Sequence, residues 1–237
     1  MTGVVRVESG QEVMLYDPLH TSNFSTLWFE PSYWASVDGL TGSAYGRGNT
    51  WFFKVQSRTY ALRHYRRGGL AARVSSDQYF YINEARTRPV REFYLNLKLR
   101  QIGLPVPLPV AVRVQRDGFS YRGDLITEQI AHAKTLAESL AMAQLPIAHW
   151  SALGRMLASF HAVGLYHADL NAHNVLLDLQ SKFWLIDFDR GALRKPGLWQ
   201  DANLVRLRHS ILKICDGLSS PLFNENLWAA LLSGYRT

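Results

Sequence analysis

The sequence contains a single cysteine, Cys215, among 237 residues. One thiol excludes an intramolecular disulfide and a cysteine-based metal cluster, which is the usage typical of a reducing compartment. No stretch approaches the roughly 18 uninterrupted apolar residues of a membrane-spanning helix, and the first residues lack the basic-then-apolar order of a signal peptide. The sequence therefore predicts a cytoplasmic protein that is soluble or peripherally attached to a membrane.

Acidic residues are also scarce, because 19 Asp and Glu stand against 26 Lys and Arg, which gives a net charge of +7. Such a balance favours an acidic partner: a nucleic acid, an anionic membrane surface, or a phosphorylated or carboxylated substrate. The sequence has neither zinc-finger spacing nor an aromatic RNA-binding signature. We therefore expect no nucleic-acid partner, and no obligate protein partner is evident.

The run His-Ala-Asp-Leu-Asn-Ala-His-Asn at residues 167–174, followed by Ile-Asp-Phe-Asp at 186–189, carries most of the functional information. Asp169, Asn174 and Asp187 have the order and spacing expected for ATP-dependent phosphoryl transfer. Asp169 is the candidate base, and Asn174 and Asp187 offer oxygen ligands to Mg²⁺. A hairpin of two short strands, 175–177 and 183–186, would fix their separation. His167 is expected to hold the loop, whereas His173 suits a structural or a substrate role equally.

The amino-terminal half has the features of a nucleotide-binding lobe. Gly46 and Gly48 lie in a glycine-rich strand-turn-strand, where backbone N–H groups could approach phosphate oxygens, although a plain hairpin would use glycine equally. In the next strand, 59–65, Arg63 occupies the place of the phosphate-binding lysine of protein kinases, and Arg66 and Arg67 compete with it for the phosphate or substrate. Glu92, early in a predicted helix over 89–103, would pair with Arg63 or only complement the helix dipole.

The remaining patterns predict strands over 110–114 and 121–128 around an Arg-Asp-Gly turn, and helices over 147–162 and 200–215. Together they indicate an α+β, bilobal protein-kinase-like fold. The predicted β-rich lobe covers residues 1–128 and binds nucleotide, and the predicted helical lobe covers 129–237 and carries the catalytic and metal-binding loops.

The chain resembles the 3-deoxy-D-manno-octulosonic acid (Kdo) kinases of Gram-negative bacteria, relatives of the lipopolysaccharide core heptose kinases. The discriminating segment is Leu-Arg-His-Tyr-Arg-Arg-Gly-Gly at 62–69, and further matching segments extend from about residue 40 to 215. The resemblance implies phosphorylation, by ATP with Mg²⁺, of the 4-hydroxyl of a lipid A-linked Kdo sugar. It also implies peripheral attachment to the anionic cytoplasmic face of the inner membrane. Candidate substrate contacts are Arg66, Arg67, His173 and Arg190.

Three departures separate the chain from protein kinases. Asn171 replaces the lysine two residues after the catalytic Asp, and the activation segment ending in Ala-Pro-Glu is absent. Asp189 replaces the glycine of Asp-Phe-Gly and is either a second metal ligand or a cap. Arg206 and Arg208 are expected on an exposed helix face or against substrate. The alternatives are a kinase of another small hydroxylated acceptor, such as another core sugar, an aminoglycoside or choline, and a non-catalytic nucleotide-binding scaffold.

Overall fold

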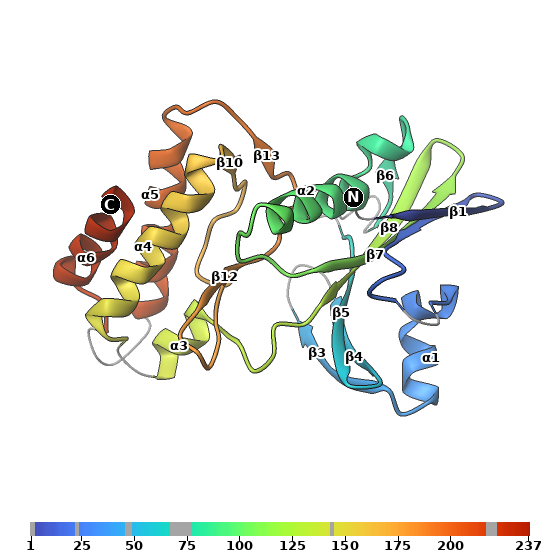
Figure 1. Cartoon of the computed structure of the whole chain (residues 1–237), viewed down its shortest axis with the longest axis horizontal. Helices are drawn as coiled ribbons and strands as arrows, with labels where there is room; N and C mark the ends of the chain where they lie inside the picture. Colours follow the sequence, from blue (N-terminus) through green and yellow to red (C-terminus); the bar gives the residue numbers. More distant parts are fainter. Residues whose placement is uncertain (1–2, 22–23, 46–48, 67–76, 143–144, 217–221) are drawn as a thin grey trace. The chain divides into compact units, whose positions relative to one another are not determined.

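A computed structural model of the chain describes residues 3–21, 24–45, 49–66, 77–142, 145–216 and 222–237. The chain divides into two compact units, Met1–Leu97 with Leu108–Gln129, and Lys98–Pro107 with Ile130–Thr237. The first unit is built on a β-sheet and the second is mainly helical (Figure 1). The predicted α+β class is confirmed. The sequence did not indicate that residues 98–107 group with the helical unit, and the functional roles assigned to the two lobes stay predictions.

The described part of the first unit contains an eight-stranded sheet of antiparallel pairs, in the order β1-β2-β7-β8-β5-β4-β3, with β6 also paired to β8. Its strands are β1 (Val5–Ser9), β2 (Glu12–Tyr16), β3 (Leu40–Tyr45), β4 (Asn49–Val55), β5 (Arg58–His64), β6 (Tyr79–Phe80), β7 (Pro109–Asp117) and β8 (Ser120–Glu128). Gly118, with φ of 56°, turns β7 into β8 as the sequence predicted. The hairpin formed by β1 and β2 was not predicted.

Each face of this sheet is covered by helical segments. Successive residues of a strand point to opposite faces, so neighbours such as Met14 and Leu15 enter different cores. One core packs the short helices η1 (Thr26–Phe29) and α1 (Pro31–Ser36) against the sheet through Trp28, Phe29 and Trp34. The other packs α2 (Arg88–Gln101), which follows the short helix η3 (Glu84–Arg86), through Val90, Phe93 and Leu97.

Helix α2 confirms the predicted helix near residues 89–103, but its apolar stripe differs at the carboxyl end. Ile102, expected on that stripe, lies beyond the helix and is 51% exposed, whereas Leu99 is buried. Gly103 has φ of 81°, a left-handed conformation that favours glycine and ends the helical path. The Ile102 N–H still bonds to the Lys98 carbonyl oxygen, so Ile102 follows the helical path. At 3.6 residues per turn, the five residues from Leu97 to Ile102 place Ile102 away from the stripe, which accounts for its exposure.

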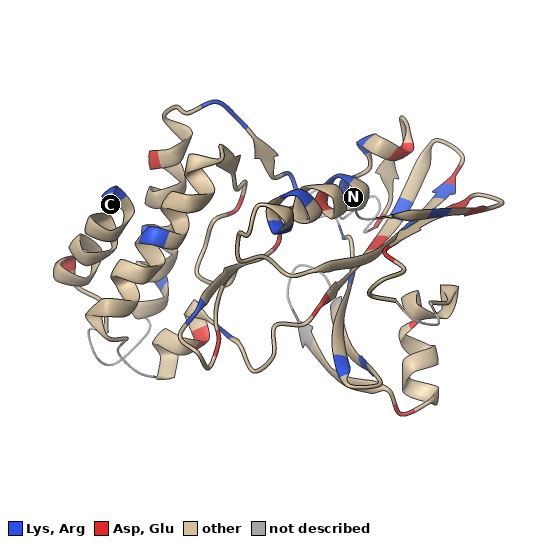
Figure 2. Ribbon diagram, in the orientation of Figure 1, with Lys and Arg blue, Asp and Glu red and all other residues tan. Residues whose placement is uncertain are grey.

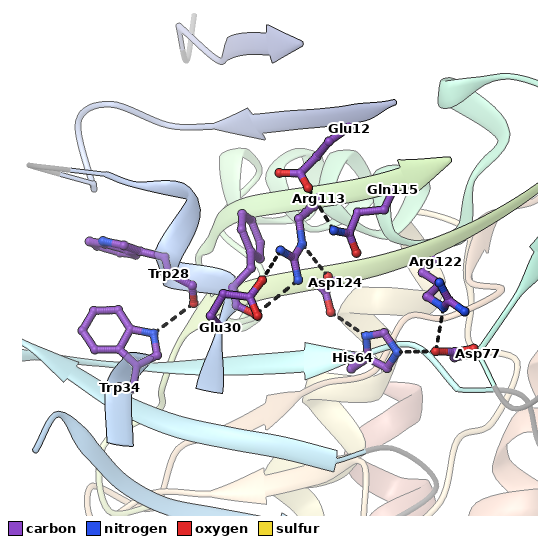
Figure 3. A network of polar contacts seen from close by, with 11 residues as sticks. Glu12, Trp28, Glu30, Trp34, His64, Asp77, Arg113, Gln115, Arg122 and Asp124 are labelled. Atoms are coloured by element: carbon purple, nitrogen blue, oxygen red, sulfur yellow. Dashed lines mark hydrogen bonds and ion pairs between the residues drawn. The ribbon is translucent and has the colours of Figure 1, made fainter. Parts of the chain in front are cut away.

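A chain of ion pairs crosses three strands on the η1 and α1 face of the sheet (Figure 3). His64 in β5 contacts Asp124 in β8 through Nδ1 at 2.6 Å, and Asp124 accepts a hydrogen bond from Nε of Arg113 in β7 at 2.8 Å. Arg113 also pairs with Glu30, next to α1. Asp124 and Arg113 are both buried. Their charges are tolerated there because each has a charged partner.

The second unit contains five helices or helical turns and several short strands within its described residues. The helices are α3 (Leu136–Met142), α4 (Ile147–Ala162), α5 (Trp199–Cys215) and α6 (Glu225–Arg236), together with the carboxyl end of α2. The strands are β9 (Lys134–Thr135), β10 (Leu165–Tyr166), β11 (Val175–Leu177), β12 (Phe183–Leu185) and β13 (Ala192–Leu193). The predicted helices over 147–162 and 200–215 are therefore confirmed.

Helices α4 and α6 approach closely because each presents a glycine to the other. A Cβ atom on Gly154 would lie 2.0 Å from the Leu231 carbonyl oxygen, and one on Gly234 would lie 2.1 Å from the Ser151 carbonyl oxygen. Trp150, Leu153, Leu157 and Phe160 of α4 are buried, as the periodicity predicted. No helix of the described residues is long and apolar enough to cross a membrane.

Candidate active site

The loop of residues 167–174 connects β10 to β11, and Asn203 of α5 fixes its first residue. The side chain of Asn203 is buried and bonds both backbone groups of His167. Its Oδ1 accepts the His167 N–H at 3.2 Å, and its Nδ2 donates to the His167 carbonyl oxygen at 2.9 Å. Sequence reasoning missed Asn203, since only its place on the inner side of a predicted helix could have indicated it.

His167 holds this loop to the segment that precedes Asp187. Its ring is buried, its Nδ1 accepts the Asp169 N–H at 3.2 Å, and its Nε2 lies 3.0 Å from the Ile186 carbonyl oxygen. Because Nδ1 accepts a hydrogen bond and Nε2 faces a carbonyl oxygen, which can only accept, the ring must be the neutral tautomer with its hydrogen on Nε2. Burial lowers the pKa of His167, which is consistent with that neutral form. The predicted structural role of His167 therefore agrees with its contacts.

Asn174 lies against the backbone of Asp169. Its Nδ2 donates to the Asp169 carbonyl oxygen at 2.9 Å, and its own backbone N–H bonds to the Asn171 carbonyl oxygen at 3.1 Å. The side chain of Asn171 also donates to the Asp169 carbonyl oxygen. Since the Asn174 nitrogen is engaged, Oδ1 is the atom that its amide could offer to a cation.

The hairpin of β11 and β12 brings Asp187 back to Asn174, as the sequence predicted. Val175 pairs with Leu185, and the Ile186 N–H then donates to the Asn174 carbonyl oxygen at 3.0 Å. Asp187 follows with φ of 64°, a conformation uncommon for a residue with a side chain. Phe188 is buried with its ring 5.4 Å from that of His167. Strand pairing and the buried Phe188 thus hold Asp187 in this conformation.

Asp169 lies within ion-pair range of α5. Nη1 of Arg206 is 3.9 Å from Oδ1 of Asp169, and both side chains remain partly exposed. Arg206 therefore presents a positive charge beside the candidate base, which the sequence left open between an exposed and a substrate-contacting role. An exposed pair at this distance contributes little to stability, so its position next to Asp169 is the more informative property.

The first unit contains the ion pair predicted between Arg63 and Glu92. Nη2 of Arg63 pairs with Oε2 of Glu92, and the Tyr65 hydroxyl donates to the same oxygen. The Arg63 guanidinium also lies 4.5 Å from the centre of the Tyr65 ring. Glu92 is buried and Arg63 is 22% exposed, so the carboxylate gains both a charge and a hydroxyl partner while the guanidinium keeps access to solvent. Tyr65 was not predicted to take part.

The other candidate residues have less structural context. Arg66, His173 and Arg190 are exposed, and Arg190 has φ of 61°. The His173 backbone N–H donates to Oδ1 of Asn171, which fixes its place on the loop without assigning a role to its ring. Gly46, Gly48 and Arg67 lie outside the described residues, so their predicted roles stay predictions.

The oxygen donors of the second unit fit a hard divalent cation. The Asn174 amide oxygen and the Asp187 carboxylate belong to segments joined by the Ile186 to Asn174 hydrogen bond. Carbonyl and carboxylate oxygens are the ligands that Mg²⁺ prefers, and it usually keeps several waters and phosphate oxygens as well. Among the described residues, no group of three or more His, Cys, Asp or Glu side chains could hold a metal ion.

A loop with Asp169 and Asn174, a hairpin leading to Asp187, and a strand arginine paired with a helix glutamate are the features of a protein-kinase-like phosphotransferase. Comparison with known families identifies the group within that class. Residues 32–235 match the lipopolysaccharide kinase (Kdo/WaaP) family, and the chain belongs to this family.

Several similar proteins that align with most of this chain share one name. The chain is 38% identical over 229 residues to a 3-deoxy-D-manno-octulosonic acid kinase of Vibrio vulnificus, covering 96% of both chains. It is 44% identical over 187 residues to a protein of the same name from Stenotrophomonas maltophilia, covering 78% of this chain and 74% of the relative. A third relative of that name, from Xylella fastidiosa, is 45% identical over 187 residues.

Proposed function

We propose that this protein is a phosphotransferase with an alcohol acceptor, which transfers the γ-phosphoryl group of ATP to the 4-hydroxyl of Kdo in Kdo-lipid IVA. The reaction belongs to the assembly of the lipopolysaccharide inner core. The observation that carries the proposal is the loop of residues 167–174, held by Asn203 and His167, in a chain that belongs to the Kdo/WaaP family.

Asp169 is proposed to orient the acceptor hydroxyl and accept its proton. A carboxylate suits this task because the transferred phosphoryl group needs an aligned acceptor more than covalent help. The Asp169 backbone is fixed at both groups, since its N–H donates to His167 and its carbonyl accepts from Asn174. The side chain is 37% exposed, which leaves it accessible to a sugar hydroxyl.

Asn174 and Asp187 are proposed to hold Mg²⁺ through one amide and one carboxylate oxygen. When bound, the ion supplies positive charge to the phosphate oxygens of the nucleotide. Arg63 is proposed to bind phosphate oxygens in place of lysine, with Glu92 and Tyr65 holding its guanidinium. Gly46 and Gly48 are proposed to line the nucleotide site, and Arg66, Arg67, His173 and Arg190 to contact the acidic substrate.

The proposed place of action is the cytoplasmic face of the inner membrane, with the protein attached peripherally. A lipid-linked acceptor that carries a carboxylate and phosphates suits a chain with a net charge of +7. An anionic lipid surface attracts the same charge.

The function is tested by incubating the purified protein with ATP, Mg²⁺ and Kdo-lipid IVA and analysing the lipid by mass spectrometry. We expect a product heavier by one phosphoryl group, with fragmentation and phosphorus NMR placing the phosphate on the 4-hydroxyl of Kdo. Chelation of the divalent ion should abolish the product. Asp169→Ala should lower kcat by about 10³-fold, the scale of a general base or orienting group, while nucleotide binding persists.

Parallel incubations with another core sugar, an aminoglycoside and choline distinguish the alternatives. Phosphate on one of these acceptors and none on Kdo-lipid IVA would establish a different kinase. Asp169→Ala that leaves turnover unchanged would refute the proposed role of this residue, and a wild-type protein that binds ATP without transferring phosphate to any acceptor would favour the scaffold alternative.

A further inference from the structure

The segment of residues 190–198, between Asp189 and α5, combines exposed leucines with a cluster of positive charge. Leu198 is 87% exposed, the highest value among the large hydrophobic side chains of the described residues, and Leu193 is 39% exposed. Arg190, Arg194 and Lys195 are also exposed, and the segment contains no Asp or Glu. Figure 2 shows the basic residues between β13 and α5. The nearest acidic residues along the chain are Asp189 and Asp201, just outside the segment.

Backbone contacts hold this segment against the turn that follows α4. β13 pairs with β10, and the Arg194 N–H donates to the Gly164 carbonyl oxygen at 2.7 Å. A Cβ atom on Gly164 would lie 2.3 Å from the Arg194 carbonyl oxygen, so the close approach requires glycine there. Val163, beside Gly164, is 38% exposed, so the residue before this glycine also presents an apolar side chain to solvent.

Side-chain contacts fix the rest of the segment. The Arg194 guanidinium lies 3.5 Å from the centre of the Tyr166 ring, which holds this charge at the protein surface. Nε1 of Trp199 donates to the Lys195 carbonyl oxygen at 2.7 Å, and the Gly197 N–H donates to Oε1 of Gln200 at 3.1 Å. The exposure of Leu198 is therefore set by a bonded turn at the start of α5, which keeps the side chain directed into solvent.

We propose that segment 190–198 docks this protein on an anionic phospholipid surface, with Leu198 inserted among the lipid headgroups and Lys195 and Arg194 bound to their phosphates. The inference rests on the proposed function in one respect, namely that the acceptor is a lipid-linked sugar. A segment that contains an exposed leucine and three positive charges but no acidic residue of its own is complementary to the apolar and anionic layers of a membrane surface. The same unit contains Asp169, so the surface and the candidate base belong to one compact body.

The test is sedimentation of the full chain with vesicles, without ATP or sugar acceptor. We expect binding to phosphatidylglycerol-containing vesicles, little binding to phosphatidylcholine vesicles, and weaker binding at high salt because the charges are screened. Leu198→Ser should lower the partition coefficient roughly tenfold, because the variant no longer buries a leucine side chain in the lipid. Lys195→Gln should weaken it about fivefold, the contribution of one basic residue near an anionic surface.

Matched controls come from the same unit. Leu179 is 72% exposed in the turn between β11 and β12, and Lys213 is exposed near the end of α5. Leu179→Ser and Lys213→Gln should bind vesicles like the wild type. Circular dichroism and thermal melting confirm that each variant is folded. Absence of wild-type binding to anionic vesicles, or equal losses in the test and control variants, would overturn the proposal.

Two further outcomes separate this proposal from the proposed function. If the wild type phosphorylates Kdo-lipid IVA in detergent but its vesicle binding is insensitive to Leu198→Ser, the docking surface is wrong and the function stands. If vesicle binding depends on Leu198 but no Kdo-lipid IVA is phosphorylated, the function is wrong and the lipid-binding surface stands. Binding only to vesicles that contain Kdo-lipid IVA would indicate recognition of the substrate headgroup and would overturn docking on phospholipid.

Discussion

The side chain of Asn203 acts on His167 in a way that few residues could reproduce. An amide carries one acceptor and one donor at fixed separation, and here the two bond the N–H and the carbonyl oxygen of a single residue. Aspartate has the same shape but only acceptor oxygens when ionised. Asn203 is therefore a positioning residue for the loop that carries Asp169, although it does not need to contact a substrate.

Asn203→Asp should consequently impair catalysis more than binding. The new carboxylate would face the His167 carbonyl oxygen, and a lost bond to a buried carbonyl costs about 1–3 kcal/mol. We expect a roughly tenfold or larger fall in kcat with little change in the KM for ATP, measured by steady-state kinetics. Asn224→Asp is the matched control, because the Asn224 side chain accepts a hydrogen bond from the Leu227 N–H, and aspartate can do the same. Equal kcat values for Asn203→Asp and the wild type would contradict the positioning role.

Glu92 provides a second test at the scale of single residues. Glu92→Gln keeps an oxygen for the Tyr65 hydroxyl but removes the charge that pairs with Arg63. Because hydrogen bonds to charged groups contribute about 1.5–3 kcal/mol, we expect the KM for ATP to rise by about tenfold or more. Glu138→Gln, at an exposed glutamate that caps α3, should leave KM unchanged. A loss of thermal stability without a change in KM would make the Arg63 and Glu92 pair purely structural.

At the scale of elements, the ion pairs of Figure 3 connect β5, the strand that carries Arg63, to β8 and β7. Arg63 and His64 are neighbours in β5, so their side chains lie on opposite faces of the sheet. Arg63 meets Glu92 of α2 on one face, whereas His64 meets Asp124 and Asp77 on the other. The register of β5 therefore places both residues, and a one-residue shift would exchange their faces.

Asp124→Asn tests how much this network contributes to the sheet. Asp124 is the shared partner of His64 and of the buried Arg113. The substitution therefore removes a negative charge that offsets the cost of burying the Arg113 guanidinium. We expect a loss of about 3–5 kcal/mol in the free energy of unfolding, measured by urea denaturation. Glu12→Gln, at the partly buried Glu12 and Gln115 contact on neighbouring strands, should cost under about 1 kcal/mol. Similar losses for the two variants would show that burial of the network is energetically unimportant.

At the scale of the whole molecule, three histidines make stability depend on pH. Burial lowers the pKa of His161 to about 4 and also lowers that of His167, so both remain neutral in the folded protein. The unfolded chain binds these protons near pH 6.5, and stability therefore falls as the pH drops below that value. The hydrogen bond to Asp124 raises the pKa of His64, whose contribution is full below pH 6.5 and is lost as the pH rises through its folded pKa.

His161→Gln isolates one of these contributions. Between pH 7.5 and pH 5, protonation of the unfolded chain at His161 should cost the wild type about 2 kcal/mol of unfolding free energy that the variant does not lose. Tyr235 contacts Nδ1 of His161 at 2.7 Å, and glutamine keeps a polar group for that hydroxyl. Denaturation curves at both pH values provide the measurement. An identical pH dependence in the two proteins would mean that His161 titrates normally in the fold.

Local patterns predicted much of the molecule, because hairpins, helix periodicity and the 167–189 motif are encoded by residues close in sequence. The β11 and β12 hairpin and the helix over 147–162 required no distant partner to be recognised. Contacts between distant segments were not predictable in the same way. Nothing in the sequence around Asn203 indicates its role, which depends on the contact with His167, a residue distant in sequence. The pairing of His64, Asp124 and Arg113 depends in the same way on which strands are neighbours in the sheet. The expectation for Ile102 was wrong for a local reason, because a residue five positions after Leu97 does not share its helix face.

The glycine-mediated approach of α4 and α6 has a consequence for biosynthesis. All strands of the large sheet have been translated once the ribosome passes Glu128, so the first unit has its full set of described strands early. α4 is translated soon afterwards but lacks its closest partner until α6 emerges, because Gly154 and Gly234 come from distant parts of the chain. We expect the nascent chain to contain a folded sheet while the helical unit is still incomplete. Until α6 is synthesised, the apolar face of α4 would be protected from aggregation only by chaperones or by rapid completion of synthesis.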